Sequence, residues 1–299
     1  MRAADYVRLV ALAAIWGASF IFMRVAAPAL GPVLTAASRV LIAGAVLIGY
    51  LAVRGLDSDL RKLWPQYLVI GVANSAIPFL LFSFAAIHLP ASYSVILNAA
   101  TPIFGALLAA IFLAERLTLV KLAGLAIGAA GVALVSRAGP VVPDAWFGWS
   151  VAACLAAALC YAGTGVYLKR CVADAKAVAV AAWSQLFAGL VLLPVVPFAP
   201  APGAITPTVV GNVLALAMLS SAVAYLLYFR LMADVGPTRT LTVTFLMPAF
   251  GMLWGALFLG EAITPPVLAG AALVVGGTAL ALRRGGHSLR ATGESAKTQ

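Results

Sequence analysis

One block of sequence occurs twice in this chain, and this duplication restricts the possible folds more than any other feature. The stretch NAATPIFGALLAAIFLAERLT (98–118) returns as TFLMPAFGMLWGALFLGEAIT (244–264), with nine identical positions that include the proline, the Phe-Gly pair and the glutamate. The same offset continues beyond the block, where Leu-Ala-Gly at 122–124 returns at 268–270. The chain is therefore predicted to consist of two copies of one unit.

Composition places both copies in a lipid bilayer. The chain is 64% hydrophobic and 9% charged, with a mean hydropathy of +1.08, whereas a soluble domain carries about 25% charged residues. A membrane-spanning helix needs roughly 20 mostly apolar residues. Ten such segments can be marked: 7–27, 33–53, 64–86, 91–113, 119–136, 147–169, 177–198, 209–231, 238–259 and 265–283. The expected fold is an all-α membrane protein with ten transmembrane helices.

Each copy then has five segments. Because five is an odd number of crossings, the second copy has the opposite orientation in the membrane. Inverted repeats are typical of secondary transporters, whose substrate sites lie between the repeats near the bilayer midplane. The predicted units are a first repeat at 1–138, a second repeat at 139–284, and a disordered cytoplasmic tail at 285–299. A central cavity is expected between the two repeats.

The distribution of lysine and arginine predicts the orientation. With the N-terminus in the cytoplasm, sixteen basic residues fall on the cytoplasmic side and three fall on or near the other side, Arg24, Arg39 and Arg137. This asymmetry makes both termini cytoplasmic. The same clustering between apolar segments argues against nucleic-acid binding, which would need a basic stripe with interleaved aromatic residues. The first apolar run is too long for a cleaved signal peptide and is read as a membrane span.

At this point the sequence resembles a known family. AIWGASFIFMR, the arginine in TAASRVLIAG, and the repeated P-x-F-G…F-L-x-E-x-x-T block look like the EamA half-repeat of the drug/metabolite transporter superfamily. More narrowly, the chain resembles YddG-type exporters of aromatic and other amino acids, although no single motif fixes the substrate. The resemblance implies a ten-helix exporter of a bacterial-type inner (plasma) membrane. Its central cavity would be lined by all helices except the peripheral fifth and tenth.

Several kinds of chemistry have no residues to support them. No glycine is followed by lysine, so the chain lacks a phosphate-binding loop for ATP. The nine acidic residues and two histidines fall in tails, loops or segment ends. We therefore expect no metal site, no cofactor and no enzymatic activity. A proton antiporter usually carries a titratable group at membrane depth. We therefore expect transport to be facilitated diffusion, uncoupled from protons.

The candidate substrate-binding residues are polar or aromatic side chains at mid-depth in segments of both halves. Amides in hydrocarbon are costly unless they face a bundle interior or a wet cavity, although hydrogen bonds between helices would also explain each residue singly. The predicted substrate-binding residues are Trp16, Ser19, Phe20, Asn74, Pro78, Phe82, Asn98, Thr101, Tyr161, Thr164, Trp183, Gln185, Tyr225, Tyr228 and Thr244.

Prolines and charged residues are further candidates for roles in gating, in attracting a solute and in capping helices. Pro78, Pro102 and Pro248 lie inside apolar segments, where proline removes a backbone hydrogen bond, so they are expected hinges for gating. Arg24, Arg39 and Lys169 either attract a solute carboxylate or anchor the helices at the membrane surface. The repeated acids, Glu115 and Glu261, stand at segment ends and are expected to cap helices.

The predicted function is therefore secondary transport. The substrate would be a small neutral or zwitterionic amphipathic metabolite, in the first place an amino acid, including aromatic ones, exported by alternating access through an uncharged cavity. The alternative is an exporter of other neutral metabolites or drugs with the same fold. A channel would need rings of carbonyls or charges, which a single pseudo-symmetric chain does not show. The expected partners are the lipid bilayer and the small solute, and a monomer is expected because dimerisation is not indicated.

Overall fold

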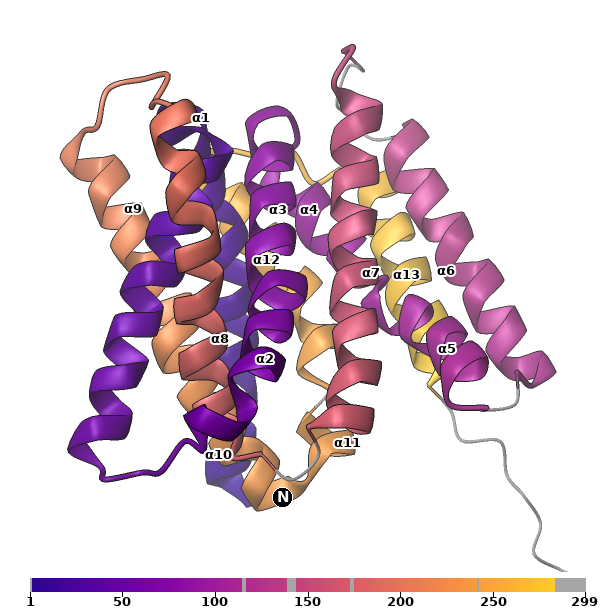
Figure 1. The fold of residues 1–299 in the computed structure, drawn as a ribbon. Coiled ribbons are helices and arrows are strands. Elements are labelled where there is room, and N and C mark those ends of the chain that lie inside the picture. Colours follow the sequence, from indigo (N-terminus) through magenta and orange to yellow (C-terminus); the bar gives the residue numbers. More distant parts are fainter. Residues whose placement is uncertain (1, 115–116, 139–143, 173–174, 241, 283–299) are drawn as a thin grey trace, which may run out of the picture.

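A computed structural model describes residues 2–114, 117–138, 144–172, 175–240 and 242–282 of the chain. Within these ranges every regular element is helical (Figure 1). The elements are α1 (Ala3–Val53), α2 (Leu60–Gly71), η1 (Val72–Ala76), α3 (Ile77–His88), α4 (Ala91–Asn98), α5 (Thr101–Phe112), α6 (Leu119–Ala138), α7 (Phe147–Cys171), α8 (Ala177–Leu192), η2 (Leu193–Phe198), α9 (Pro207–Ala217), η3 (Met218–Val223), α10 (Ala224–Val235), α11 (Pro237–Thr240), α12 (Val243–Leu259) and α13 (Pro265–Ala281).

The helices are long and apolar enough for a multi-pass membrane protein. In the described part of the chain, seven helical stretches have the length and composition to cross a bilayer, and α12 and α13 are shorter apolar helices. The first stretch, α1, is 51 residues long and contains a kink at Gly31, whose φ of 75° lies outside the helical range. Glycine adopts positive φ without steric cost, and the adjacent Pro32 donates no backbone hydrogen bond. The chain therefore turns within α1 and forms two helices.

Element boundaries recur at the spacing found in the sequence. η1 begins at Val72 and η3 begins at Met218, which corresponds to Val72 at the offset of the repeat. α6 begins at Leu119 and α13 begins at Pro265, and these two positions correspond in the same way. Both η1 and η3 are π-helical, a rare conformation that is frequently found at functional sites. Hydropathy alone predicts one straight segment at each of these places, because it does not detect a change in hydrogen-bond register.

Two ends of the bundle are distinguished below. The N-terminal end carries the N-terminus, the end of α10, and α11 (Figure 1). The distal end is the opposite one, where α3 meets α4. Basic side chains such as Arg8 and Arg230 lie at the N-terminal end, where both bond to Asp234 at 2.6 and 3.1 Å.

The glycine-rich helices α6 and α13 pack against each other at one edge of the bundle (Figure 1). A Cβ built on Gly124 would lie 2.5 Å from the backbone nitrogen of Ala281, and one on Gly277 would lie 2.5 Å from that of Gly128. Such backbone contact requires small residues. The small-residue spacing in these two segments is thus explained by packing within the chain.

Replacing Gly277 by leucine is expected to separate α6 from α13 and to destabilise the folded protein by about 1–3 kcal/mol, the usual cost of overpacking. The matched control is Gly276→Leu, because a Cβ on Gly276 meets no atom within 4 Å. The measurement is thermal unfolding of the purified variants in detergent. Equal melting temperatures for the two variants would contradict the described packing.

Candidate functional site

A central cavity of about 770 Å³ lies between helices of both halves of the chain. From the first half, residues on α1, α2, η1, α3, α4 and α5 line it, and from the second half, residues on α7, α8, η3, α10 and α12. The predicted residues that the structure places in this lining are Trp16, Ser19, Phe20, Asn74, Phe82, Asn98, Thr101, Tyr161, Tyr225, Tyr228 and Thr244.

Aromatic rings form much of the cavity wall. The ring of Trp16 lies 5.4 Å from that of Tyr228 and 6.5 Å, edge-on, from that of Tyr225. Phe82 contacts Phe20 edge-to-face at 5.4 Å and stacks on Tyr161 at 6.1 Å. Rings at these separations attract one another and stiffen the wall. The cavity therefore offers a preformed apolar surface with hydroxyl and amide groups at its edges.

Four predicted residues lie outside the lining. Thr164 is 2% exposed and donates to the carbonyl of Cys160, whereas Gly165, one helical turn after Tyr161, reaches the cavity. The ring of Trp183 lies 6.1 Å from that of Phe187. On the helix that carries Trp183 and Gln185, the cavity face is formed by Val180, Ala181 and Ser184. On these two helices the cavity is therefore lined by residues other than Thr164, Trp183 and Gln185.

Gln185 and Pro78 lie behind the cavity wall. The side chain of Gln185 is completely buried and donates through Nε2 to Ser75 Oγ at 2.9 Å and to the hydroxyl of Tyr225 at 3.3 Å. Tyr225 lines the cavity, so Gln185 acts on the cavity by fixing this phenol. Pro78 is buried at the start of α3, directly after η1.

The expectation of an uncharged cavity is wrong, because Arg39 and Lys169 both belong to the lining. Arg39 was expected near a membrane surface, yet its side chain points into the bundle and is 5% exposed. Lys169 is exposed at the end of α7. Of the described residues, those that line the cavity include no carboxylate and no histidine.

The cavity reaches the N-terminal end of the bundle. Its lining there includes Lys169, Val172 and Ala175, at and after the end of α7, together with Met232 near the end of α10. At the distal end, Leu89, in the connection between α3 and α4, is fully buried. The cavity therefore approaches the N-terminal end, and its described lining includes no residue of the α3–α4 connection at the distal end.

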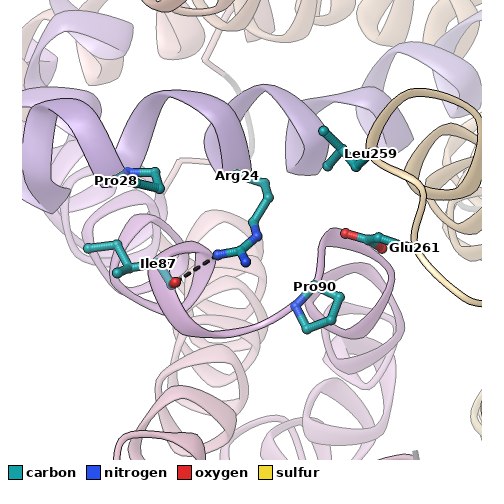
Figure 2. Close-up of a pocket in the computed structure, with 6 residues that line it drawn as sticks. All are labelled: Arg24, Pro28, Ile87, Pro90, Leu259 and Glu261. Atoms are coloured by element: carbon teal, nitrogen blue, oxygen red, sulfur yellow. Dashed lines mark hydrogen bonds between the residues drawn. The ribbon is translucent and has the colours of Figure 1, made fainter. Parts of the chain in front are cut away.

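Two charged side chains approach the α3–α4 connection at the distal end (Figure 2). Arg24, on α1, points to the connection between α3 and α4 and donates through Nη1 to the carbonyls of Ala86 and Ile87, both at 2.7 Å. These carbonyls belong to the last turn of α3, where a cation is favoured. Glu261 approaches the same connection near Pro90, and a second, smaller pocket lies between it and Arg24.

Glu261 caps α4. Its carboxylate accepts hydrogen bonds from the backbone N–H groups of Ala91 at 2.6 Å and Ser92 at 2.9 Å, which would otherwise lack partners at the start of the helix. The capping role expected for this residue is confirmed, but the capped helix belongs to the other half of the chain. Glu115, its counterpart in the repeat, lies outside the described residues.

The three prolines differ in their local structure. The helix breaks after Asn98, and α5 begins at Thr101 with Pro102 in its first turn. Pro78 follows the π-helical η1. Pro248 is buried inside α12, which continues through it. Two of the expected hinges therefore coincide with interruptions of helical geometry, and the third does not.

The fold and the cavity together are those of a multi-pass membrane transporter. The sequence pattern of the EamA-like transporter family matches the chain twice, at residues 6–137 and 148–283. The chain belongs to this family.

Curated relatives and a solved structure match nearly the whole chain. A Streptantibioticus cattleyicolor protein named "Probable terminal-alkyne amino-acid exporter" is 28% identical over 277 residues, covering 90% of each chain. A Salmonella typhimurium protein named "Probable amino-acid metabolite efflux pump" is 27% identical, covering 88% of this chain and 89% of the relative. A Chlamydia trachomatis S-adenosylmethionine/S-adenosylhomocysteine transporter is 28% identical, covering 85% and 81%. A crystal structure with 22% identity superposes with a TM-score of 0.66 over 94% of this chain and 97% of the other.

Proposed function

We propose that this protein is a secondary exporter of small amphipathic metabolites, specifically amino acids including aromatic ones, and that it works by alternating access. Ten membrane-spanning helices would form two inverted five-helix repeats, at 1–138 and 139–284, followed by a tail at 285–299. Both termini would face the cytoplasm, in a bacterial-type inner membrane. Two relatives, named "Probable terminal-alkyne amino-acid exporter" and "Probable amino-acid metabolite efflux pump", support the substrate class.

One observation carries the proposal, namely the cavity between the two halves. Its volume of about 770 Å³ falls in the range that accommodates small-molecule ligands. The cavity approaches the N-terminal end, which would face the cytoplasm by the distribution of basic residues, and its described lining does not include the α3–α4 connection. This arrangement is the state that would load a solute from the cytoplasm before export.

The chemistry of the wall favours an amphipathic solute. Trp16, Tyr161 and Tyr228 offer flat apolar surfaces, and Asn74 and Asn98 offer amide groups. A strongly phosphorylated solute would need a cluster of arginine or lysine clamps. The breaks at Ala99–Ala100 and at η1 are our proposed hinges, because interrupted helices are where rocking motions occur in transporters.

The proposal is tested by reconstituting the purified protein in liposomes with a panel of labelled neutral amino acids. We expect flux that saturates with concentration and is inhibited by unlabelled panel members. Flux that rises linearly without saturation would identify a channel. Saturable flux of other neutral metabolites, S-adenosylmethionine or drugs, without any flux of amino acids, would favour the alternative substrate class.

Transport is also expected to be independent of an imposed pH gradient. The described cavity lining contains no carboxylate or imidazole that could exchange a proton at neutral pH. The same liposomes are compared with equal pH on both sides and with a gradient of about two units, at a fixed solute gradient. An acceleration of about threefold or more by the pH gradient would contradict facilitated diffusion.

A further inference from the structure

Arg39 is a buried cation in the cavity wall, and no acidic side chain of the described residues pairs with it. Its Nε donates to Ser221 Oγ at 3.0 Å, its Nη1 approaches Met23 Sδ at 3.8 Å, and its Cζ lies 3.7 Å above the centre of the Phe79 ring. No carboxylate of the described residues lies within 4 Å of it. Arginine keeps its charge when buried, and a buried charge is costly unless a counter-charge or a polar solute compensates it.

The second half of the chain contains the counterpart of this bond. Gln185 stands at the position that corresponds to Arg39 at the repeat offset, and it donates to Ser75 Oγ at 2.9 Å. Ser75 lies in η1, and its own counterpart, Ser221, lies in η3. Each half therefore donates a hydrogen bond to the π-helical serine of the other half. The two bonds are equivalent except in charge, because one donor is a guanidinium and the other is an amide.

Whereas both N–H donors of the Gln185 amide are occupied, the guanidinium of Arg39 retains unused N–H donors. It has five N–H donors, of which the described contacts occupy the one on Nε and one on Nη1. The stacked Phe79 ring and the bond to Ser221 fix the plane of the group. Arg39 lines the cavity, whereas Gln185 lies behind it. A planar, fixed guanidinium that faces a cavity matches the geometry of a carboxylate, which it binds with two parallel hydrogen bonds.

We propose that Arg39 is the carboxylate-binding subsite of the cavity, and that the transported solutes carry a free carboxylate. The inference rests on the proposed transport function and adds a requirement to it. The carboxylate would bind beside Phe79 and Ser221, in the cavity lining to which Tyr161 and Tyr225 also belong. The apolar part of the solute would then lie along the aromatic wall. Amides and esters of the same solutes would be excluded, because they offer no anion to the buried cation.

The test compares acids with their amides as inhibitors of labelled phenylalanine flux and as ligands that raise the melting temperature of the purified protein. The pairs are phenylalanine with phenylalaninamide, and 3-phenylpropionate with 3-phenylpropionamide. The second pair separates carboxylate recognition from repulsion of a cationic amide. In the wild type, each acid is expected to bind about tenfold or more tightly than its amide, because hydrogen bonds to charged groups are the strong ones.

The main variant is Arg39→Gln, which copies the residue that the other half carries at the equivalent position and can keep the bond to Ser221. We expect affinity for the acids to fall about 10- to 100-fold and affinity for the amides to stay unchanged. Arg39→Lys keeps the charge without the planar fork and should give an intermediate loss. Arg61→Gln is the matched control, since it removes an exposed arginine at the start of α2. Size-exclusion profiles confirm that each variant is folded.

The outcomes separate the two proposals. Equal preference for acids in the wild type and in Arg39→Gln overturns the carboxylate subsite and leaves the transport function intact. Amides that bind as well as acids to the wild type overturn the subsite in the same way. Absence of flux and binding for every panel member overturns the amino-acid transport function, and the subsite with it.

Discussion

Replacing Trp16 by alanine is expected to weaken transport of aromatic and large apolar amino acids by about 30-fold in apparent affinity. The indole contacts Tyr225 and Tyr228 and forms one side of the cavity. Truncation of a buried aromatic anchor at a binding site typically costs about 2 kcal/mol or more, which corresponds to this factor. The measurement is the concentration dependence of labelled phenylalanine flux in liposomes.

The control for this variant is Trp149→Ala. Trp149 is 69% exposed at the start of α7 and lies outside the cavity lining, so its loss should leave the affinity unchanged. Tyr161→Ala, which removes the ring stacked on Phe82, is expected to behave like Trp16→Ala. If Trp16→Ala and Tyr161→Ala both transport every solute with wild-type affinity, the cavity is not the substrate site.

Replacing Glu261 by alanine is expected to loosen the distal end of the bundle. The variant leaves the N–H groups of Ala91 and Ser92 without their acceptors. Loss of a capping side chain costs about 0.5–2 kcal/mol, and more when the acceptor is charged and partly buried. Backbone amides at the start of α4 should therefore exchange with deuterium about 10- to 30-fold faster.

Hydrogen exchange measured by mass spectrometry on the peptide that covers α4 tests this expectation. The matched control is Asp144→Ala, which removes a carboxylate whose side chain is 58% exposed and which lies 3.8 Å from His88, at the end of α3. This control should leave exchange in α4 unchanged. Wild-type exchange rates in Glu261→Ala would show that the carboxylate does not hold the α3–α4 connection.

The repeat in the sequence predicted much of the architecture. Similar spacing of glycine and apolar runs gives similar helix boundaries at several places, and α6 and α13 begin at corresponding positions, Leu119 and Pro265. Hydropathy also located the segments that surround the cavity. Hydropathy did not detect the π-helical turns at η1 and η3, because a change of hydrogen-bond register within an apolar run leaves the composition unaltered.

The candidate site was only partly predictable, because the direction of a side chain depends on packing that is distant in sequence. Thr164 and Gly165 are neighbours, but only Gly165 reaches the cavity. Arg39 resembles a membrane anchor in the sequence, and only the approach of Phe79 and Ser221 from other helices shows that it is buried. Glu261 was expected to cap a helix, yet its partners lie 169 and 170 residues away.

The central proposal is that the cavity is the solute passage and that it opens alternately to the two faces of the membrane. A direct measurement uses Thr101→Cys, in the cavity lining, after replacement of Cys154, Cys160 and Cys171. A membrane-impermeant maleimide is applied to vesicles of either orientation, with and without a saturating amino acid. We expect the maleimide to label the introduced cysteine from the face that carries the N-terminus, at a rate that the solute lowers. We expect the rate of labelling from the other face to be higher in Glu261→Ala. Alternating access would be contradicted by equal labelling from both faces that changes neither with the solute nor in Glu261→Ala. Labelling from neither face would also contradict it.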